Sequence, residues 1–360
     1  MKNIYRPEFF YLGSITDKER FEKLLKKAPC IYDSIESQLR ELIKVRNPSV
    51  NPSEDEYESL VRQHLNGADL YHYGVWVYFP WSNRLVHLLD EDEFIDVRTN
   101  RNKDKITETE QKLLKEKRVG VIGLSVGQSI ALTLAMERAC GALRLADFDV
   151  VELSNLNRIR TGVHHLNVSK VVIAAREIAE IDPFIEVEVF DKGLNSDNIE
   201  DFITSNGKLD VMVEVCDSLE VKIKSRIEAK KHKIPVIMET NDRCMLDIER
   251  FDIEPNRAIL HGLISNSDIQ NLEILSPKEK IDLILKLVDG QELSERMKYS
   301  FSMLGKTLRS WPQLASSVTL GGGVTTEIVR RVLLNEDIHS GRRYFDIDDI
   351  LFENIKYQLA

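Results

Sequence analysis

The sequence has few cysteines, and their spacing argues against two classes of protein. Only four occur among 360 residues, none of them in a C-x-x-C pair. They are Cys30, Cys140, Cys216 and Cys244. Such isolated thiols are not typical of a disulfide framework or of a cysteine zinc site. We therefore expect no structural zinc, and we expect a reducing, cytoplasmic compartment.

The sequence also lacks an excess of positive charge and lacks long apolar runs. The formal net charge is −10 and the pI is about 5.5, whereas a nonspecific nucleic-acid binder usually has a basic face. No apolar run approaches the roughly 20 residues that span a bilayer. The first residues, MKNIYRPEFF, lack the apolar block of a signal peptide. We expect neither a nucleic-acid partner nor a membrane partner.

From Arg118 onward, strand and helix patterns alternate along the chain. The expected strands are 118–123, 142–147, 185–190, 209–215 and 234–239, and the expected helices between them are 126–140, 169–181, 196–206 and 218–233. This alternation is typical of an α/β fold with a mostly parallel, Rossmann-like sheet and helices on both faces. After Glu239 we expect a strand at 246–251, a long helix at 311–335 and a closing strand at 343–348.

The region before this alternation reads differently. Residues 73–89 predict a β-hairpin, because two aromatic or apolar runs flank a turn. We expect His87 on this hairpin and the charge run 90–93 to lie at the surface. The sequence thus predicts an N-terminal α+β region, 1–97, followed by a second domain, 98–360.

The first strand of the alternation leads into a loop with two glycines. Gly123 ends the strand and Gly127 opens the next helix. Such a turn lets the backbone approach a phosphate, and the N–H groups at the start of the helix attract an anion. Asp147 ends the second strand 20 residues beyond Gly127 (147 − 127), the usual position of a ribose-binding acid.

Polar residues after the second strand indicate which nucleotide would bind. Asn155, Arg158 and Lys170 follow it, and two cations suit a triphosphate whose leaving pyrophosphate gains charge. Asp217 follows a later strand, where a carboxylate could hold Mg²⁺. The plainer interpretation is that Arg158 and Lys170 are solvated surface charges and that Asp217 caps a helix.

The segment Arg98–Phe251 resembles the ThiF/MoeB adenylyltransferases of the ubiquitin-activating-enzyme superfamily. The motif that carries the resemblance is LADFDVVELSNLNR, an acid-rich strand followed by S-N-L-x-R. A nearer similarity is to the ThiF-domain region of longer bacterial proteins with a nitroreductase-like domain. Because this chain stops at Ala360, we expect no such flavin domain in it. The glycine loop departs from the family at Ser125, Val126 and Gln128.

The resemblance implies the roles of individual residues. Arg158, Lys170 and Asp217 would be catalytic, Asp217 would hold Mg²⁺, and Arg101 would reach into the ATP site of a partner in a homodimer. The predicted cofactor-binding residues are Gly123, Ser125, Gly127, Asp147, Asp149 and Asn155.

The function that this resemblance implies is an ATP-dependent adenylyltransferase. It would activate a carboxylate as an acyl-adenylate and release pyrophosphate. The acceptor would be a metabolite or a small protein, such as the C-terminus of a ubiquitin-like or sulfur-carrier protein. Two alternatives stay open: a non-catalytic nucleotide-binding or interaction module with a degenerate ATP site, and an NAD-dependent oxidoreductase.

Overall fold

The computed structural model describes residues 4–270, 272 and 274–351, and it divides into two compact units. The first unit contains residues up to Gln111 together with Ile178–Phe184, and the second contains Lys112–Glu177 and the residues from Ile185 onward. The sequence-based boundary between two domains at residue 97 stays a prediction. The ends of these two predicted domains, residues 1–3 and 352–360, lie outside the described residues.

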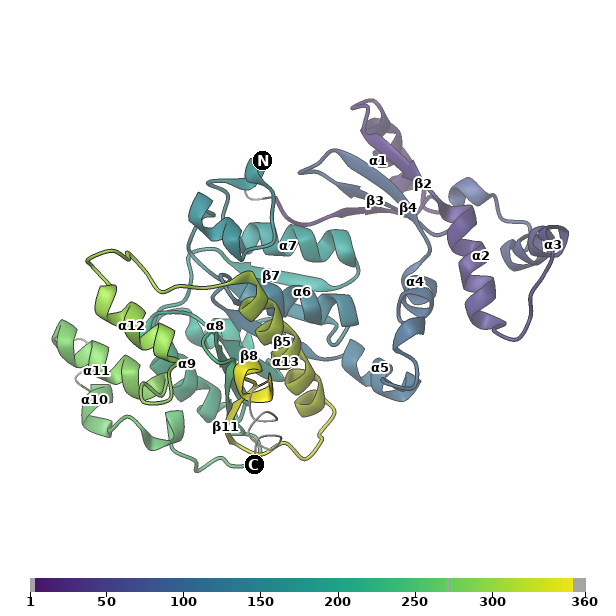
Figure 1. Cartoon of the computed structure of the whole chain (residues 1–360). Coiled ribbons are helices and arrows are strands. Elements are labelled where there is room, and N and C mark those ends of the chain that lie inside the picture. Colours follow the sequence, from purple (N-terminus) through teal and green to yellow (C-terminus); the bar gives the residue numbers. More distant parts are fainter. Residues whose placement is uncertain (1–3, 271, 273, 352–360) are drawn as a thin grey trace. The chain divides into compact units, whose positions relative to one another are not determined.

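The second unit is built on a seven-stranded sheet in the order β11-β10-β9-β8-β5-β6-β7 (Figure 1). Its strands are β5 Arg118–Ile122, β6 Ala142–Ala146, β7 Glu186–Phe190, β8 Val211–Glu214, β9 Val236–Thr240, β10 Met245–Glu249 and β11 Gly341–Tyr344. The five strands β9-β8-β5-β6-β7 are parallel, and β10 and β11 extend the sheet antiparallel. The predicted mostly parallel sheet is confirmed.

Helices cover both faces of this sheet. The contacts of two neighbouring residues of β5, which point to opposite faces, show this. A Cβ on Gly120 would meet the ring of Phe202 in α8 (Ile199–Thr204), whereas the Val121 side chain contacts Gly127 of α6 (Gly127–Glu137). Successive residues of a strand point to opposite faces, so α6 and α8 lie on opposite sides. Both faces are therefore buried, which explains the continuous apolar runs of the central strands.

Helices α7 Lys170–Ile181, α9 Leu219–Lys231 and α13 Ala315–Leu333 occur in the predicted order. Between β10 and α13 the chain also forms α10 Asn266–Gln270, α11 Pro277–Leu287 and α12 Glu295–Met303. Helix α13 begins four residues later than the predicted 311, because 311–314 form no helix and Leu314, its N-cap, has an extended backbone. It packs against α6.

The first unit has its own four-stranded sheet in the order β1-β3-β4-β2. Its elements are β1 Glu8–Phe10, α1 Ile15–Leu25, β2 Cys30–Asp33, α2 Ile35–Arg46, α3 Glu54–Leu65, β3 Val75–Phe79, β4 Arg84–Leu88, α4 Glu91–Arg98 and α5 Glu108–Lys115, whose last residues belong to the second unit. Strands β3 and β4 form the predicted hairpin. The predicted N-terminal α+β region is confirmed.

The predicted surface position is wrong for His87, and for the charge run 90–93 it holds for Asp90 and Asp92 but not for Glu93. His87 is completely buried, stacks on Trp76 and hydrogen-bonds Asp33 and the Tyr73 carbonyl. In the charge run 90–93, Glu93 is also buried, where it accepts a hydrogen bond from the Tyr73 hydroxyl. Both side chains are tolerated inside because each has hydrogen-bond partners.

Among the described residues, none of the helices combines the length and apolar character that crossing a membrane requires.

Candidate nucleotide site

A polar pocket of about 660 Å³ lies at the carboxyl ends of β5, β6 and β8 in the second unit. Ligands of open parallel sheets bind at this edge. The pocket brings together most of the predicted residues: Gly123, Ser125, Asp147, Asp149, Asn155, Arg158, Lys170 and Asp217. Gly127 and Arg101 are not among its lining residues.

The two glycines of the first loop have packing roles. Gly123 has φ of +88°, and a Cβ there would lie 2.8 Å from Cys216 Cα. A Cβ on Gly127 would lie 2.8 Å from Val121 Cγ1. A larger residue at Gly123 would therefore displace the loop that carries Cys216, and one at Gly127 would displace α6 from β5. These contacts explain both glycines without a phosphate.

Gln128, a departure from the family pattern, points away from the pocket. Its amide group donates to the Arg160 carbonyl at 3.1 Å and to Glu177 at 2.8 Å, and its oxygen accepts from Arg160 N at 2.9 Å. The side chain is 3% exposed and is not part of the pocket lining. Gln128 therefore anchors the 158–161 segment and does not obstruct the pocket.

Asp147 is held rigidly at the end of β6. One carboxylate oxygen accepts from Leu124 N at 2.6 Å and the other from Asp149 N at 2.8 Å. Burial raises the pKa of Asp147, although these two hydrogen bonds and nearby Lys170 oppose the rise. Each carboxylate oxygen keeps a second lone pair, so Asp147 can still accept from a ligand hydroxyl.

Lys170 begins α7 and reaches back across the pocket. Its ammonium lies 2.8 Å from Asp149 Oδ2, and its side chain is 8% exposed. The interpretation of Lys170 as a solvated surface charge is therefore wrong. A phosphate that enters the pocket would share this ammonium with Asp149.

Arg158 and Asp217 come from different loops and meet in the pocket. Arg158 Nε donates to Ser125 Oγ at 3.0 Å, and Nη1 donates to Asn157 at 2.8 Å. Burial lowers the pKa of Arg158, and the negative charge of Asp217 opposes this effect. Asp217 is exposed, and the N-cap of α9 is Ser218. The alternative role of Asp217 as the cap is therefore wrong.

The remaining predicted residues have different positions. Asn155 lies in the 3-10 turn η3 (Leu153–Asn157), where its Oδ1 accepts from Glu152 N at 3.0 Å. Arg101 is exposed on the turn η2 (Asn100–Asn102) of the first unit. Its predicted role in the site of a partner chain stays a prediction.

The pocket also has a wall that the sequence analysis missed. Ser310, Trp311, Pro312 and Gln313 line it from the segment before α13. The Gln313 carbonyl accepts from Asn157 Nδ2 at 2.7 Å. The Trp311-Pro312 pair is an unusual sequence feature that could have suggested a functional segment. Because it lies far from the glycine loop in the sequence, its position in the same pocket could not be predicted.

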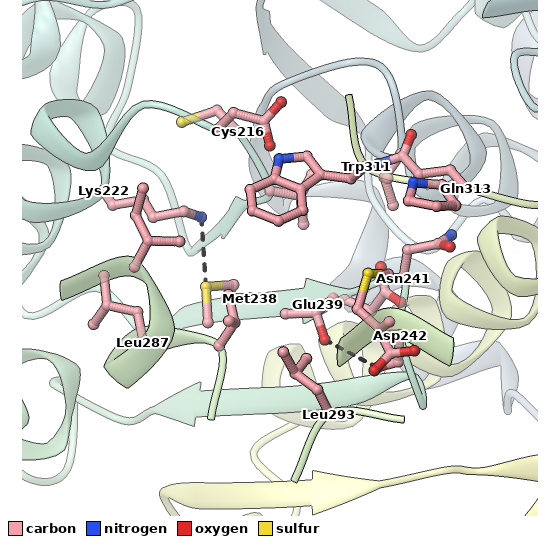
Figure 2. Close-up of a pocket in the computed structure, with 18 of the residues that line it drawn as sticks. Cys216, Lys222, Met238, Glu239, Asn241, Asp242, Leu287, Leu293, Trp311 and Gln313 are labelled. Atoms are coloured by element: carbon pink, nitrogen blue, oxygen red, sulfur yellow. Dashed lines mark hydrogen bonds between the residues drawn. The ribbon is translucent and has the colours of Figure 1, made fainter. Parts of the chain in front are cut away.

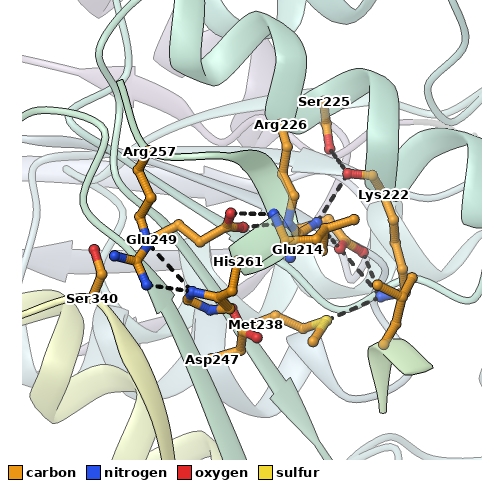
Figure 3. Close-up of polar contacts among 12 residues, drawn as sticks. Glu214, Lys222, Ser225, Arg226, Met238, Asp247, Glu249, Arg257, His261 and Ser340 are labelled. Atoms are coloured by element: carbon orange, nitrogen blue, oxygen red, sulfur yellow. Dashed lines mark hydrogen bonds and ion pairs between the residues drawn. The ribbon is translucent and has the colours of Figure 1, made fainter. Parts of the chain in front are cut away.

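A buried ion network supports the strand end that carries Asp217 (Figure 3). Glu214 ends β8, accepts from Cys216 N at 2.9 Å, and pairs with Lys222 at 3.0 Å and Arg226 at 2.6 Å. Although burial disfavours its charge, these two cations hold the pKa of Glu214 below its ordinary value. The network therefore fixes the Val215–Asp217 turn beside the pocket.

This fold and this edge pocket define an α/β protein with a candidate ligand site at the carboxyl edge of its parallel strands. The sequence profile of the ThiF family matches residues 98–355. The chain therefore belongs to the ThiF family.

Individual relatives match shorter stretches or longer proteins. An uncharacterised Mycobacterium tuberculosis protein is 45% identical over 276 residues, which are 77% of this chain and 38% of that protein. A Haemophilus influenzae molybdopterin-synthase adenylyltransferase is 27% identical over 154 residues, 42% of this chain and 62% of that enzyme. The chain thus spans less than two thirds of either relative.

Among solved structures, the E. coli tRNA threonylcarbamoyladenosine dehydratase TcdA in complex with AMP is similar. It has a TM-score of 0.48 and 18% identity, and the match covers 69% of this chain and 98% of TcdA.

Proposed function

We propose that this protein activates a carboxylate by ATP-dependent adenylation. The observation that carries the proposal is the convergence of Arg158, Lys170, Asp147 and Asp217 on one polar pocket at the carboxyl edge of the sheet. Membership of the ThiF family and the similarity to an adenylyltransferase support it. In this reaction the substrate carboxylate attacks the α-phosphorus of ATP, and pyrophosphate leaves.

The residues of the pocket have chemical properties that fit this reaction. Arg158 and Lys170 would stabilise the charge that grows on the phosphates, and Asp147 would accept from a ribose hydroxyl. Asp217 is exposed, whereas Asp147 is buried and Asp149 pairs with Lys170, so Asp217 could hold a hydrated Mg²⁺ without displacing a buried partner. Ser125, Asp149 and Asn155 would orient these groups through the hydrogen bonds described above.

Binding of ATP would exchange partners within the pocket. Arg158 and Lys170 now bond Ser125, Asn157 and Asp149, and triphosphate oxygens would replace part of these contacts. These internal contacts hold both cations in the pocket before ATP binds, which would reduce the cost of ordering them.

The acceptor and the assembly are also part of the proposal. We infer a small carboxylate-bearing protein or metabolite as the substrate, by analogy with relatives named as ubiquitin-like modifier-activating and molybdopterin-synthase adenylylating enzymes. A homodimer in which Arg101 completes the site of the partner, and a cytoplasmic location, are consistent with this function.

ATP–pyrophosphate exchange, measured with a panel of carboxylate acceptors, tests the proposal. We expect Asp217→Ala to lower exchange on the order of 100-fold, because Mg²⁺ would lose its protein ligand. Asp197→Ala is the matched control, since Asp197 is exposed and lies outside the pocket lining. Equal exchange by the two variants would contradict the role of Asp217.

A non-catalytic nucleotide-binding module is the second candidate, and the internal partners of Arg158 and Lys170 favour it. Equilibrium binding of ATP in the presence of Mg²⁺ separates the two functions. Binding without exchange for any acceptor would support the module, whereas acceptor-dependent exchange would exclude it.

A further inference from the structure

An apolar chamber of about 160 Å³ adjoins the polar pocket in the second unit (Figure 2). The two cavities share the walls Val215–Asp217 and Trp311–Gln313. The other walls come from α11, α12 and the end of β9, and they are mostly apolar or aromatic. The side chains that define this surface are Met238, Leu287, Leu293, Met297, Phe301 and Trp311.

Glu239 is one of the residues that line this chamber, and its carboxyl group has no partner among the described residues. Glu239 lies near the end of β9 and is 4% exposed. Neither of its carboxyl oxygens has a hydrogen-bond partner in the described part of the chain. Burial raises its pKa to about 8. A buried carboxyl without a partner is costly to the fold, so its presence here calls for a ligand.

The packing of α13 accommodates this carboxyl. A Cβ on Gly321 would lie 2.4 Å from Glu239 Oε1, whereas a Cβ on Gly323 in the same helix would meet nothing within 4 Å. Gly321 thus leaves the space that the Glu239 carboxyl occupies. Gly321 is buried and Gly323 is exposed, so Gly323→Ala controls for the effect of alanine on the helix itself.

The other charges around the chamber are already compensated or negative. Lys222, a cation in the lining, pairs with Glu214 at 3.0 Å. Asp242 accepts hydrogen bonds from the Ser294 amide and hydroxyl, and Asp217 faces Arg158. The nearby Cys244 thiol has a pKa raised to about 12 by burial and by Glu239. A ligand with a positive charge would therefore complement the chamber.

We propose that the chamber binds a primary amine with a small aromatic or branched apolar body, and that its ammonium group pairs with Glu239. The volume fits such a body, since an apolar cavity of about 150 Å³ holds benzene. The faces of Trp311 and Phe301 favour a cation through their π electrons. Met238, Leu287 and Leu293 would bury the apolar body.

Because the two cavities share walls, an amine in the chamber would lie next to an acyl-adenylate in the polar pocket. The reaction that we infer for this amine rests on the proposed adenylation. The bound ammonium gives one proton to Glu239, and the free amine attacks the acyl carbon of the adenylate. The bond from that carbon to the phosphate oxygen breaks, AMP leaves with the electron pair, and the second nitrogen proton passes to water. The product is an amide, and the amine is the second substrate.

Calorimetric titration with benzylamine tests the site directly, with benzyl alcohol as the neutral compound of the same shape. We expect benzylamine to bind the full chain roughly tenfold tighter than the alcohol, because it forms a charge-assisted hydrogen bond. Glu239→Gln should remove this preference. Equal affinities for the two compounds, or an unchanged preference in Glu239→Gln, would overturn the proposal.

The glycine pair gives a second test that keeps the charge. We expect Gly321→Ala to weaken benzylamine binding, since the new methyl group displaces the Glu239 carboxyl, while Gly323→Ala keeps the wild-type affinity. Circular dichroism and the melting temperature confirm that each variant is folded. Equal affinity of the two folded variants would count against this geometry.

Dependence on pH distinguishes the carboxyl from other groups. The affinity of the wild type should rise as the pH increases toward about 8, because Glu239 loses its proton. The Glu239→Gln variant should show no such rise. Binding of benzylamine needs no ATP, so failure of this site and failure of adenylation are separable: exchange without amine binding refutes only the chamber, and amine binding without exchange refutes only adenylation.

Discussion

Two buried glutamates at the ends of neighbouring strands have opposite environments. Glu214 ends β8 and is completely buried between Lys222 and Arg226. Glu239 lies on β9, is 4% exposed and has no partner among the described residues. The pKa of Glu214 lies below its ordinary value because the two cations outweigh burial, whereas burial raises the pKa of Glu239 to about 8.

The difference separates a structural role from a ligand-binding role. A paired carboxylate holds strands and helices in register, as Figure 3 shows for Glu214, Arg226 and Glu249. An unpaired one contributes nothing to the fold and costs desolvation energy. We therefore attribute Glu214 to support of the Asp217 turn and Glu239 to recognition of a ligand.

Loss of the central cation should have the largest effect on stability. Arg226 is 0% exposed and pairs with Glu214 and Glu249, each at 2.6 Å. In Arg226→Met, both carboxylates lose this partner while they stay buried. We expect the free energy of unfolding to fall by about 3–5 kcal/mol, measured by urea denaturation.

An exposed arginine provides the control for this measurement. Arg62→Met removes an ion pair whose arginine and glutamate side chains are 75% and 56% exposed, and it should leave stability nearly unchanged. Equal losses in the two variants would contradict the structural role of the buried network.

The unpaired glutamate should produce the opposite signature as the pH changes. Burial raises the folded-state pKa of Glu239 to about 8 from its ordinary value of 4.5. Between these values the folded state binds more protons than the unfolded state, so this group lowers stability as the pH rises through that window.

The Glu239→Gln variant should therefore gain stability relative to the wild type as the pH increases from about 5 to about 8. The difference should grow by up to about 1.4 kcal/mol per pH unit and level off above about 8. Urea denaturation at several pH values measures it. A difference that is independent of pH would mean that Glu239 is not a buried, unpaired carboxyl.

The sequence predicted the central strands well because they are buried on both faces and appear as largely apolar runs. The edge strand β7 was found from the alternation of Glu and Val in EVEVF. All five of β5, β6, β7, β8 and β9 lie within two residues of the expected bounds. Short elements escaped prediction. Strand β2 has four exposed residues and no alternation, so only its pairing with β4 identifies it.

The candidate site was predictable as far as it follows strand ends. Asp147 and Asp217 directly follow apolar runs, and carboxyl ends of parallel strands meet at one edge. Trp311 and Glu239 were not predicted as site residues. Trp311 reaches the pocket through packing of the segment before α13, and the isolation of Glu239 depends on the absent side chain of Gly321. Such contacts form only in the tertiary structure, so no local sequence pattern predicts them.

The smallest expected effect concerns Lys222, the second cation that pairs with Glu214. Its ammonium pairs with Glu214 and contacts the Met238 sulfur at 3.5 Å, and it lines the chamber. In Lys222→Met, Glu214 keeps Arg226, so the free energy of unfolding should fall by only about 1–2 kcal/mol. Loss of a cation beside the chamber should at the same time leave benzylamine binding unchanged or tighter. Weaker binding in a folded Lys222→Met protein would show that the lysine, and not Glu239, determines which ligands the chamber accepts.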